Sequence, residues 1–312
     1  MSEEPTPVQR DVLEALGSRP HERPTFDPRL REWLRDDLDA GLGPLLDGLD
    51  GDRQLWLSKH DLGAVHGCEA AYLADRDEPF EWTTATARGT VAHKAVELSV
   101  HWRGEPVPGD LVDEAMARLA GGNDALGTWL AALDEGERAE LRGEAVDRVA
   151  KFLEVFPPLE SRWRPVAESR LRAELAGDRV VLAGKADLTV GRAAGLVAGK
   201  VIIDLKTGGF SPAHRDDLRF YALVESLRLG VPPRLLATLY LDSGRLVTEA
   251  VTEDVLQAAV QRTLDGARAL VELRTGREPV RRPGVPCRWC PLRPECPDGR
   301  RWLEDRDDQD GW

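Results

Sequence analysis

One stretch of the sequence, residues 201–208, places two opposite charges at the end of a strongly apolar strand. It reads V-I-I-D-L-K-T-G, so three β-branched residues lead directly into Asp204, Leu205 and Lys206. Side chains two residues apart on a strand point to the same face of the sheet. A charge buried there without a partner costs roughly several kcal/mol. Asp204 and Lys206 must therefore pair with each other, bind a metal or meet a ligand.

The composition is that of a large globular protein that is not embedded in a membrane. The chain has 312 residues, of which 42% are hydrophobic, and it contains no apolar run of membrane-spanning length. Its first ten residues, MSEEPTPVQR, are polar and acidic, unlike a secretory signal peptide, so we expect a cytoplasmic protein. The net charge of −13 argues against a general nucleic-acid coat, although it permits an enzyme with a local basic groove.

The positive charge that the chain does have is concentrated towards its C-terminal end. Residues 262–301 contain ten arginines and five acidic residues, whereas the first fifty residues and the last twelve are acidic. This segment is either a solvated helix face or a track for nucleic-acid phosphates.

Helical patterns come first along the chain, and strands alternate with helices later. Helices are expected over 55–74, over Thr83–His101 and through most of 110–156, after a turn-rich connector at 41–48. The expected later elements are strands 166–175, 179–190, 200–205, 235–241 and 245–251, with helices at 212–229 and 252–275. This order predicts an α/β fold with a mixed sheet flanked by helices. We predict an N-terminal helical extension (1–54), a main domain (55–298) with a helical insertion at about 105–158, and an acidic tail (299–312).

A second carboxylate is expected beside Asp204. Asp187 lies on the preceding strand, and the turn between the two strands is short enough for antiparallel pairing. Two close carboxylates and a lysine suit a divalent metal such as Mg²⁺, which would activate water for phosphodiester hydrolysis. For the D-x-K pattern alone, a salt bridge between Lys206 and an acid is the more ordinary explanation.

Two further residues can extend this group. His93 lies in G-T-x-x-H on a predicted helix and is either a partly buried helix residue or a nitrogen ligand to the metal. Glu168 introduces a charge into an apolar strand. It is either an additional carboxylate of the metal site or an exposed residue at the edge of the sheet, and we give the two alternatives equal weight. On the helix after Lys206, Arg219 and Tyr221 are candidates to contact DNA, but Tyr221 is as easily a core residue.

All four cysteines of the chain can belong to one site. Cys287, Cys290 and Cys296 are closely spaced, and Cys68 lies 219 residues before the first of them. Four thiolates bind Zn²⁺ or an iron–sulfur cluster. Zinc sites usually have two C-x₂-C pairs, so three cysteines plus one distant cysteine favour a cluster.

These motifs, in this order, resemble the PD-(D/E)xK nucleases of the RecB-like exonuclease branch. The similar positions are His93, Glu168, Asp187 within G-K-A-D, Asp204 and Lys206 within D-L-K-T-G, and the helix of Tyr221. The cysteines make the chain similar to the iron–sulfur members of that branch, the AddB nuclease domain and the CRISPR-adaptation nucleases. The fold implied is restriction-endonuclease-like, with a C-terminal cysteine cluster.

The resemblance implies roles for these residues. His93, Asp187 and Asp204, with the carbonyl of Leu205, would bind Mg²⁺ or Mn²⁺; Lys206 would be catalytic; and the cysteines would hold a [4Fe–4S] cluster. One position departs from the family pattern, since Asp217 stands where a glutamine is usual.

The function expected is that of a metal-dependent DNA exonuclease acting on single strands or DNA ends in repair, recombination or defence. The sequence has no G-x-x-x-x-G-K-[ST] motif, so a helicase would be a separate partner. Two alternatives remain at this stage: a non-catalytic DNA-binding or assembly subunit that retains the fold, and a zinc-stapled protein of unrelated function.

Overall fold

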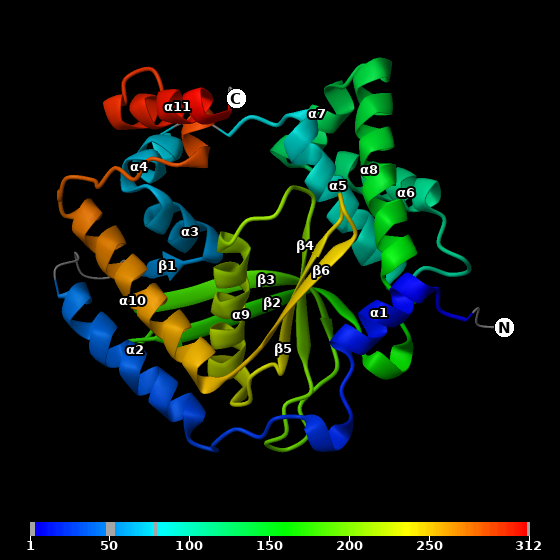
Figure 1. Ribbon diagram of the computed structural model, residues 1–312, viewed down its shortest axis with the longest axis horizontal. Helices are drawn as coiled ribbons and strands as arrows, with labels where there is room; N and C mark the ends of the chain where they lie inside the picture. Colours follow the sequence, from blue (N-terminus) through cyan, green and yellow to red (C-terminus); the bar gives the residue numbers. More distant parts are fainter. Residues whose placement is uncertain (1–3, 48–53, 78–79, 311–312) are drawn as a thin grey trace.

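The centre of the protein is a mixed six-stranded β-sheet (Figure 1). The computed structural model describes residues 4–47, 54–77 and 80–310. The strands follow the order β1-β3-β4-β5-β6, and β2 pairs with β3 outside that path. Their bounds are β1 (Leu55–Leu57), β2 (Val166–Leu175), β3 (Val180–Val190), β4 (Val201–Lys206), β5 (Leu235–Tyr240) and β6 (Arg245–Ala250). Parallel and antiparallel pairs alternate in this sheet, which confirms the predicted α/β fold.

Helices cover both faces of the sheet (Figure 1). They are α1 (Pro7–Leu16), α2 (Leu30–Leu46), α3 (Lys59–Gly67), α4 (Glu69–Asp77), α5 (Thr84–Ser99), α6 (Pro108–Ala120), α7 (Ala125–Ala132), α8 (Glu135–Val155), α9 (Ala213–Leu229), α10 (Glu253–Arg274) and α11 (Pro297–Asp310). Within the described ranges, none of them combines the length and the apolarity needed to cross a membrane.

The alternation of side chains along β4 separates two cores. Ile202 belongs to a core that includes residues of α2, α9 and α10. Val201, Ile203 and Leu205 belong to a second core with residues of α1 and α8. Because side chains two residues apart share a face, Asp204 and Lys206 lie on the same side of the sheet as Ile202, the side covered by α9.

The helical segment that precedes β2 forms a third core with α5. Residues of α6, α7 and α8 pack around the buried face of α5, including Val91, Ala92 and Ala95. Pro157 and Pro158 follow α8 and lead to β2. The segment predicted to be a helical insertion therefore supports the helix that carries His93.

The helix predicted over 55–74 begins only after Ser58, which caps α3 as its sequence suggests, and it is broken at Cys68 before α4. Its first three residues are not helical. Leu55 and Leu57 are buried, whereas Trp56 between them is exposed, and this alternation belongs to strand β1. β1 pairs with β3 in parallel, with Leu55 opposite Val180. Three residues are too few to show a strand period in the sequence, and the two helices that follow have apolar residues close by.

The predicted connector at 41–48 is also wrong, because most of it lies inside α2. Pro44 is within the helix, in its last turn, where Leu42 and Leu46 are buried and hold the segment against the core. Gly41 allows this close packing, because a Cβ at this position would lie 2.6 Å from a methyl group of Leu264. At the other end of the chain, residues 299–310 of the expected acidic tail lie in α11, and residues 311 and 312 lie outside the described residues.

The edge of β3 that faces β1 and β4 has a gap that positions the functional site. β2 pairs with β3 from Val180 to Thr189 on one edge. On the other edge, β1 reaches Leu182 and β4 begins pairing at Leu188. β1 and β4 run in opposite directions, so their carboxyl ends point towards each other. We call residues 183–187 on this edge of β3 the notch.

Candidate active site

Asp187 and Asp204 meet where β3 and β4 separate. The two strands pair antiparallel, as predicted, and their ladder ends at Leu188 and Ile203. One step further, the register would place Asp187 opposite Asp204. Instead, Oδ2 of Asp187 accepts a hydrogen bond of 2.7 Å from the backbone N–H of Leu205. This bond takes the place of the next ladder bond and fixes the Asp187 carboxylate in the notch.

Glu168 on β2 lies at the same place, where the pairing of β2 with β3 is interrupted. Its neighbours Ala167 and Ser169 pair with Leu188 and Ala186, but Glu168 itself, opposite Asp187, forms no pair. Its φ of 54° is in the left-handed region, which costs a non-glycine residue roughly 1–3 kcal/mol. Its carboxylate forms an ion pair with Lys185. Glu168 is therefore held in a strained conformation beside Asp187.

His93 completes a compact group of ligand atoms. Its Nδ1 lies 3.3 Å from Oδ1 of Asp187. One ligand atom each from His93, Glu168 and Asp187 lie within 4.8 Å of one another, a grouping able to hold a metal ion. Burial disfavours the charged imidazole, but the hydrogen-bonded carboxylate of Asp187 outweighs it and raises the pKa of His93. The sequence suggested each of these residues separately, and the structure brings all three together.

Helix α5 can bring His93 this close because of a glycine near its start. A Cβ on Gly89 would lie 3.0 Å from the hydroxyl oxygen of Thr207, in the turn after β4. The G-T pair in the sequence therefore has a packing role. Glu97, one turn after His93, pairs with Lys94 on the same helix. No contact of Glu97 with the imidazole is seen among the described residues.

Asp204 is the most deeply buried acid of the site, with 1% of its surface exposed. Its Oδ1 accepts a hydrogen bond of 2.9 Å from Nζ of Lys59. Nζ of Lys206 lies 2.9 Å from Oδ2, as an ion pair outside hydrogen-bonding geometry. Each oxygen of Asp204 therefore faces an ammonium group. Asp204 lies outside the compact group of His93, Glu168 and Asp187.

Lys59 is a residue of the site that the sequence reasoning missed. It begins α3 directly after β1, where Ser58 caps the helix and Asp61 completes a capping box. Its ammonium also lies 4.9 Å from the ring centre of Tyr221. Burial disfavours this charge, but Asp204 and its neighbours raise the pKa of Lys59 well above its ordinary value. The sequence signal for Lys59 is the helix cap at Ser58, directly before it. This cap points to the site only when β1 is known to end at the notch.

Asp217 occupies the position where the family pattern has glutamine, and it faces the two lysines. Its Oδ2 lies 3.3 Å from Nζ of Lys206 and 3.9 Å from Nζ of Lys59. Helix α9 thus supplies a fourth carboxylate to the site, after those of Glu168, Asp187 and Asp204. The two ammonium groups compensate its negative charge.

The two residues considered as DNA contacts have other partners. Tyr221 is 2% exposed, and its ring packs against Gly184, where a Cβ would lie 2.4 Å from the ring. The guanidinium of Arg219 donates two hydrogen bonds to Glu249, of 2.9 and 2.6 Å. Of the two alternatives for Tyr221, this burial agrees with a core residue, because α9 turns its side chain towards the core.

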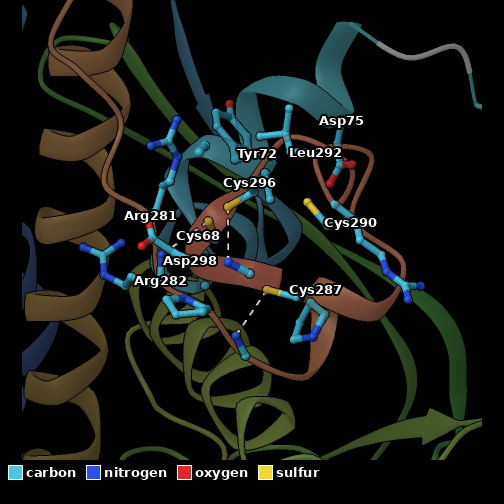
Figure 2. Close-up of a pocket in the computed structure, with 18 of the residues that line it drawn as sticks. Cys68, Tyr72, Asp75, Arg281, Arg282, Cys287, Cys290, Leu292, Cys296 and Asp298 are labelled. Atoms are coloured by element: carbon cyan, nitrogen blue, oxygen red, sulfur yellow. Dashed lines mark hydrogen bonds between the residues drawn. The ribbon is translucent and has the colours of Figure 1, made fainter. Parts of the chain in front are cut away.

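The four cysteines line one cavity of about 290 Å³ (Figure 2). Cys68 ends α3, Cys287 and Cys290 lie in and after a short 3₁₀ turn, and Cys296 precedes α11. Backbone N–H groups of residues 282, 284 and 299 donate to the sulfurs of Cys68, Cys287 and Cys296 at 3.4–3.5 Å. Burial raises the pKa of the Cys290 thiol.

A glycine keeps this cavity open. A Cβ on Gly299 would lie 3.3 Å from the sulfur of Cys287 and 3.5 Å from that of Cys296. A cavity of about 290 Å³ is roughly ten times the volume of a water molecule, so it has room for a group of several atoms. The residues present are therefore compatible with a cofactor held by thiolates.

Comparison with known families agrees with the arrangement of acids and lysine on the sheet. The family described as the PD-(D/E)XK nuclease superfamily matches residues 57–297, from the end of β1 to the start of α11. The chain belongs to this superfamily. The matched residues include Asp187 on β3 and Asp204-Leu205-Lys206 on β4.

Solved structures give a weaker likeness. The chain is similar to a Eubacterium rectale protein described as a candidate exonuclease, with a TM-score of 0.45 and 14% identity over 79% of this chain and 87% of that one. It is also similar to SSO0001, with a TM-score of 0.35 and 13% identity over 85% and 94% of the two chains. No curated protein sequence matches the chain. Membership of the superfamily therefore rests on the family match.

Proposed function

We propose that this PD-(D/E)XK protein is a divalent-metal-dependent DNA exonuclease of the RecB-like branch, acting on single strands or DNA ends. The observation that carries the proposal is the convergence of His93, Glu168 and Asp187 within 4.8 Å, with Asp204 on the neighbouring strand directly after the Leu188–Ile203 pair. Carboxylate oxygens with one imidazole suit Mg²⁺ or Mn²⁺.

Each residue has a definite task in this proposal. His93, Asp187, Asp204 and the Leu205 carbonyl would hold the ion, and Glu168 would add a carboxylate on the other side of Asp187. A bound ion would supply Lewis acidity, lowering the pKa of a water molecule and offsetting charge on the phosphate. Lys206, anchored between Asp204 and Asp217, would direct its positive charge to the attacked phosphate. Lys59 holds the carboxylate of Asp204 in place through its hydrogen bond to Oδ1.

Cleavage assays with end-labelled DNA test the activity. Single-stranded, double-stranded and RNA substrates are compared with Mg²⁺, with Mn²⁺ and with EDTA. Asp204→Asn should lower the rate by roughly 100-fold or more, because it weakens the metal site that provides several kcal/mol of transition-state stabilisation. The matched control is Asp216→Asn, because Asp216 lies on α9 next to Asp217 and pairs with Arg219 and Arg262 instead of the site lysines.

The result also separates the proposal from its main alternative. DNA binding without cleavage by the wild-type protein in either metal would contradict a nuclease and favour a non-catalytic binding subunit. Equal cleavage by wild type and Asp204→Asn would show that a contaminating nuclease is responsible. The partner expected for an active enzyme is a separate helicase in repair, recombination or defence in the cytoplasm.

We further propose that Cys68, Cys287, Cys290 and Cys296 hold a structural [4Fe–4S] cluster. Three closely spaced cysteines and one distant cysteine line one cavity, whereas zinc sites usually have two C-x₂-C pairs, and this pattern supports the cluster over the zinc staple. In the described part of the chain, no three of the cysteine sulfurs lie within 4.8 Å of one another, so the support comes from the sequence pattern and the shared cavity and not from the spacing of the sulfurs.

Metal analysis of protein purified without oxygen tests this second proposal. We expect iron and sulfide, a brown colour, and no stoichiometric zinc. Gly299→Ala should lower the iron content, since its methyl group would press on the sulfurs of Cys287 and Cys296. Gly143→Ala on α8 is the control, because its Cβ would meet nothing within 4 Å. A colourless protein with one zinc ion would establish the zinc-stapled alternative.

A further inference from the structure

A second cavity, lined by arginines, lies at the end of the sheet opposite the notch. It has a volume of about 440 Å³. It is formed by the end of α1, the segment before β2, the end of β3 with the residues after it, and the starts of β4 and β5. Val201 lines it, and Lys206 of the active site is five residues further along β4, roughly 16 Å away. We call it the arginine cavity after five of its lining residues, Arg23, Arg162, Arg164, Arg192 and Arg234.

The charge of the arginine cavity is uncompensated. Its described lining contains no aspartate or glutamate. Of its five arginines, only Arg162 has a carboxylate within 4.0 Å in the described structure, that of Glu160. The active site differs in this respect, because Lys59 and Lys206 there share carboxylate partners. Like charges that face one cavity repel one another, and an anion between them removes that cost.

Arg234 shows this imbalance at the level of single atoms. One of its terminal nitrogens donates to the carbonyl of Leu16, but its buried Nε has no hydrogen-bond partner in the described structure. Burial, together with the charge of Arg23, lowers the pKa of the Arg234 guanidinium. A buried donor without an acceptor costs roughly 1–3 kcal/mol, so this arrangement is unfavourable without a ligand.

The backbone around the arginine cavity is held in place before any ligand arrives. The N–H of Arg234 donates to the carbonyl of Lys200 at 2.8 Å, and the N–H of Gly191 donates to that of Trp163 at 2.6 Å. A Cβ on Gly199 would lie 2.1 Å from the carbonyl oxygen of Arg192, so only glycine allows the two turns to approach. These contacts fix the positions from which the arginines project.

We propose that the arginine cavity binds a nucleoside monophosphate, either free or as the phosphorylated end of a nucleic-acid strand. Guanidinium groups bind phosphate oxygens through paired hydrogen bonds, and here several face one cavity. The half-buried ring of Trp163, with Leu13 and Phe156 nearby in the lining, provides an apolar surface on which a base can stack. The volume falls in the range of small-ligand sites. The site goes beyond the proposed nuclease activity and does not depend on it.

Calorimetric titration tests the site. It is done in EDTA because, without a divalent ion, the carboxylates at the notch repel phosphate and do not compete for the ligand. The ligands are deoxyadenosine monophosphate, deoxyadenosine, inorganic phosphate, and a short oligonucleotide with and without a 5′-phosphate. The test variant is Arg164→Asn with Arg192→Gln. Both arginines are exposed, and asparagine tolerates the φ of 52° at position 164, so the fold should be retained. Thermal unfolding of each variant checks this.

The expected result is saturable binding of a phosphorylated ligand that the double variant weakens by roughly 100-fold, or about tenfold for each guanidinium removed. Arg10→Gln removes an exposed charge from α1 outside the cavity and should change binding by less than about twofold, because solvent ions screen it. Tighter binding of the free nucleotide or of the phosphorylated strand identifies the source of the ligand.

Three outcomes would overturn the proposal. These are no saturable binding of either phosphorylated ligand, equal binding by wild type and the double variant, and binding of deoxyadenosine as tight as that of its monophosphate. The nuclease assay is independent of all three, since Arg164 and Arg192 lie outside the notch.

Discussion

Replacing Lys59 by methionine isolates the role of the lysine that the sequence did not reveal. The change keeps most of the side-chain volume and removes the ammonium 2.9 Å from Oδ1 of Asp204. Removing one partner of a buried ion pair costs about 3–5 kcal/mol. Lys206 remains 2.9 Å from the other oxygen of Asp204, so we expect a smaller loss of unfolding free energy, about 2–3 kcal/mol, in EDTA.

Divalent metal should restore this stability selectively. Without Lys59, Oδ1 of Asp204 has lost its ammonium partner and can bind a cation, so Mn²⁺ should raise the unfolding temperature more in the variant than in the wild type. A ligand at 100 times its dissociation constant adds about 2.7 kcal/mol, which is enough to offset the loss. Denaturant unfolding with and without Mn²⁺ measures both values.

Lys94→Met is the matched control for this experiment. Lys94 has nearly the same side-chain exposure as Lys59, 25% against 26%, but it pairs with Glu97 on the surface of α5. We expect a loss below about 1 kcal/mol and no extra response to Mn²⁺. If Mn²⁺ stabilised Lys59→Met and the wild type equally, Lys59 would not be compensating the charge of the metal site.

Three other substitutions test separate parts of the site. Glu168→Asn should preserve the unfolding free energy or raise it by up to about 1 kcal/mol, because asparagine tolerates the left-handed φ. The affinity for Mn²⁺, measured by calorimetry, should fall. A large loss of stability would show that the backbone at Glu168 is not strained. Gly184→Ala should destabilise by about 1–3 kcal/mol in denaturant unfolding, because its methyl group would overlap the ring of Tyr221, and an unchanged midpoint would refute this. Phe210→Ala should raise KM for single-stranded DNA about tenfold if this exposed ring, in the loop after β4, stacks on a base; an unchanged KM excludes it as a DNA-binding residue.

The sequence was most informative where a site residue and its structural context are close together in the chain. The apolar run before Asp204 identified a buried strand, and the short turn after Val190 identified its antiparallel neighbour with Asp187. Both inferences need only the two-residue period of a strand and the reach of a turn. The mixed sheet followed from the order of these elements.

The sequence was least informative where contacts are distant or where the backbone departs from its ordinary conformation. Lys59 reaches Asp204 across 145 residues, and only the docking of the three-residue strand β1 on β3 makes that contact visible. Nothing in the residues around Glu168 marks its left-handed φ, which arises from the break in the β2–β3 ladder. The direction of Tyr221 was undetermined because a tyrosine on a helix suits either a core or a surface.

The position of the notch between β1 and β4 also sets the moment during synthesis at which the candidate site is complete. Its two sides come from β1 and β4, and Lys59 is translated long before Asp204. At about 5–20 residues per second, the 145 residues between them take roughly 7–30 s to synthesise. Until β4 leaves the ribosome, β3 has no partner at Leu188–Val190 on that edge, and Asp204 cannot join the carboxylates of Glu168 and Asp187. A chain that ends before β4 lacks Asp204, Lys206 and the backbone N–H that fixes Asp187, so the candidate site is complete only once β4 is in place.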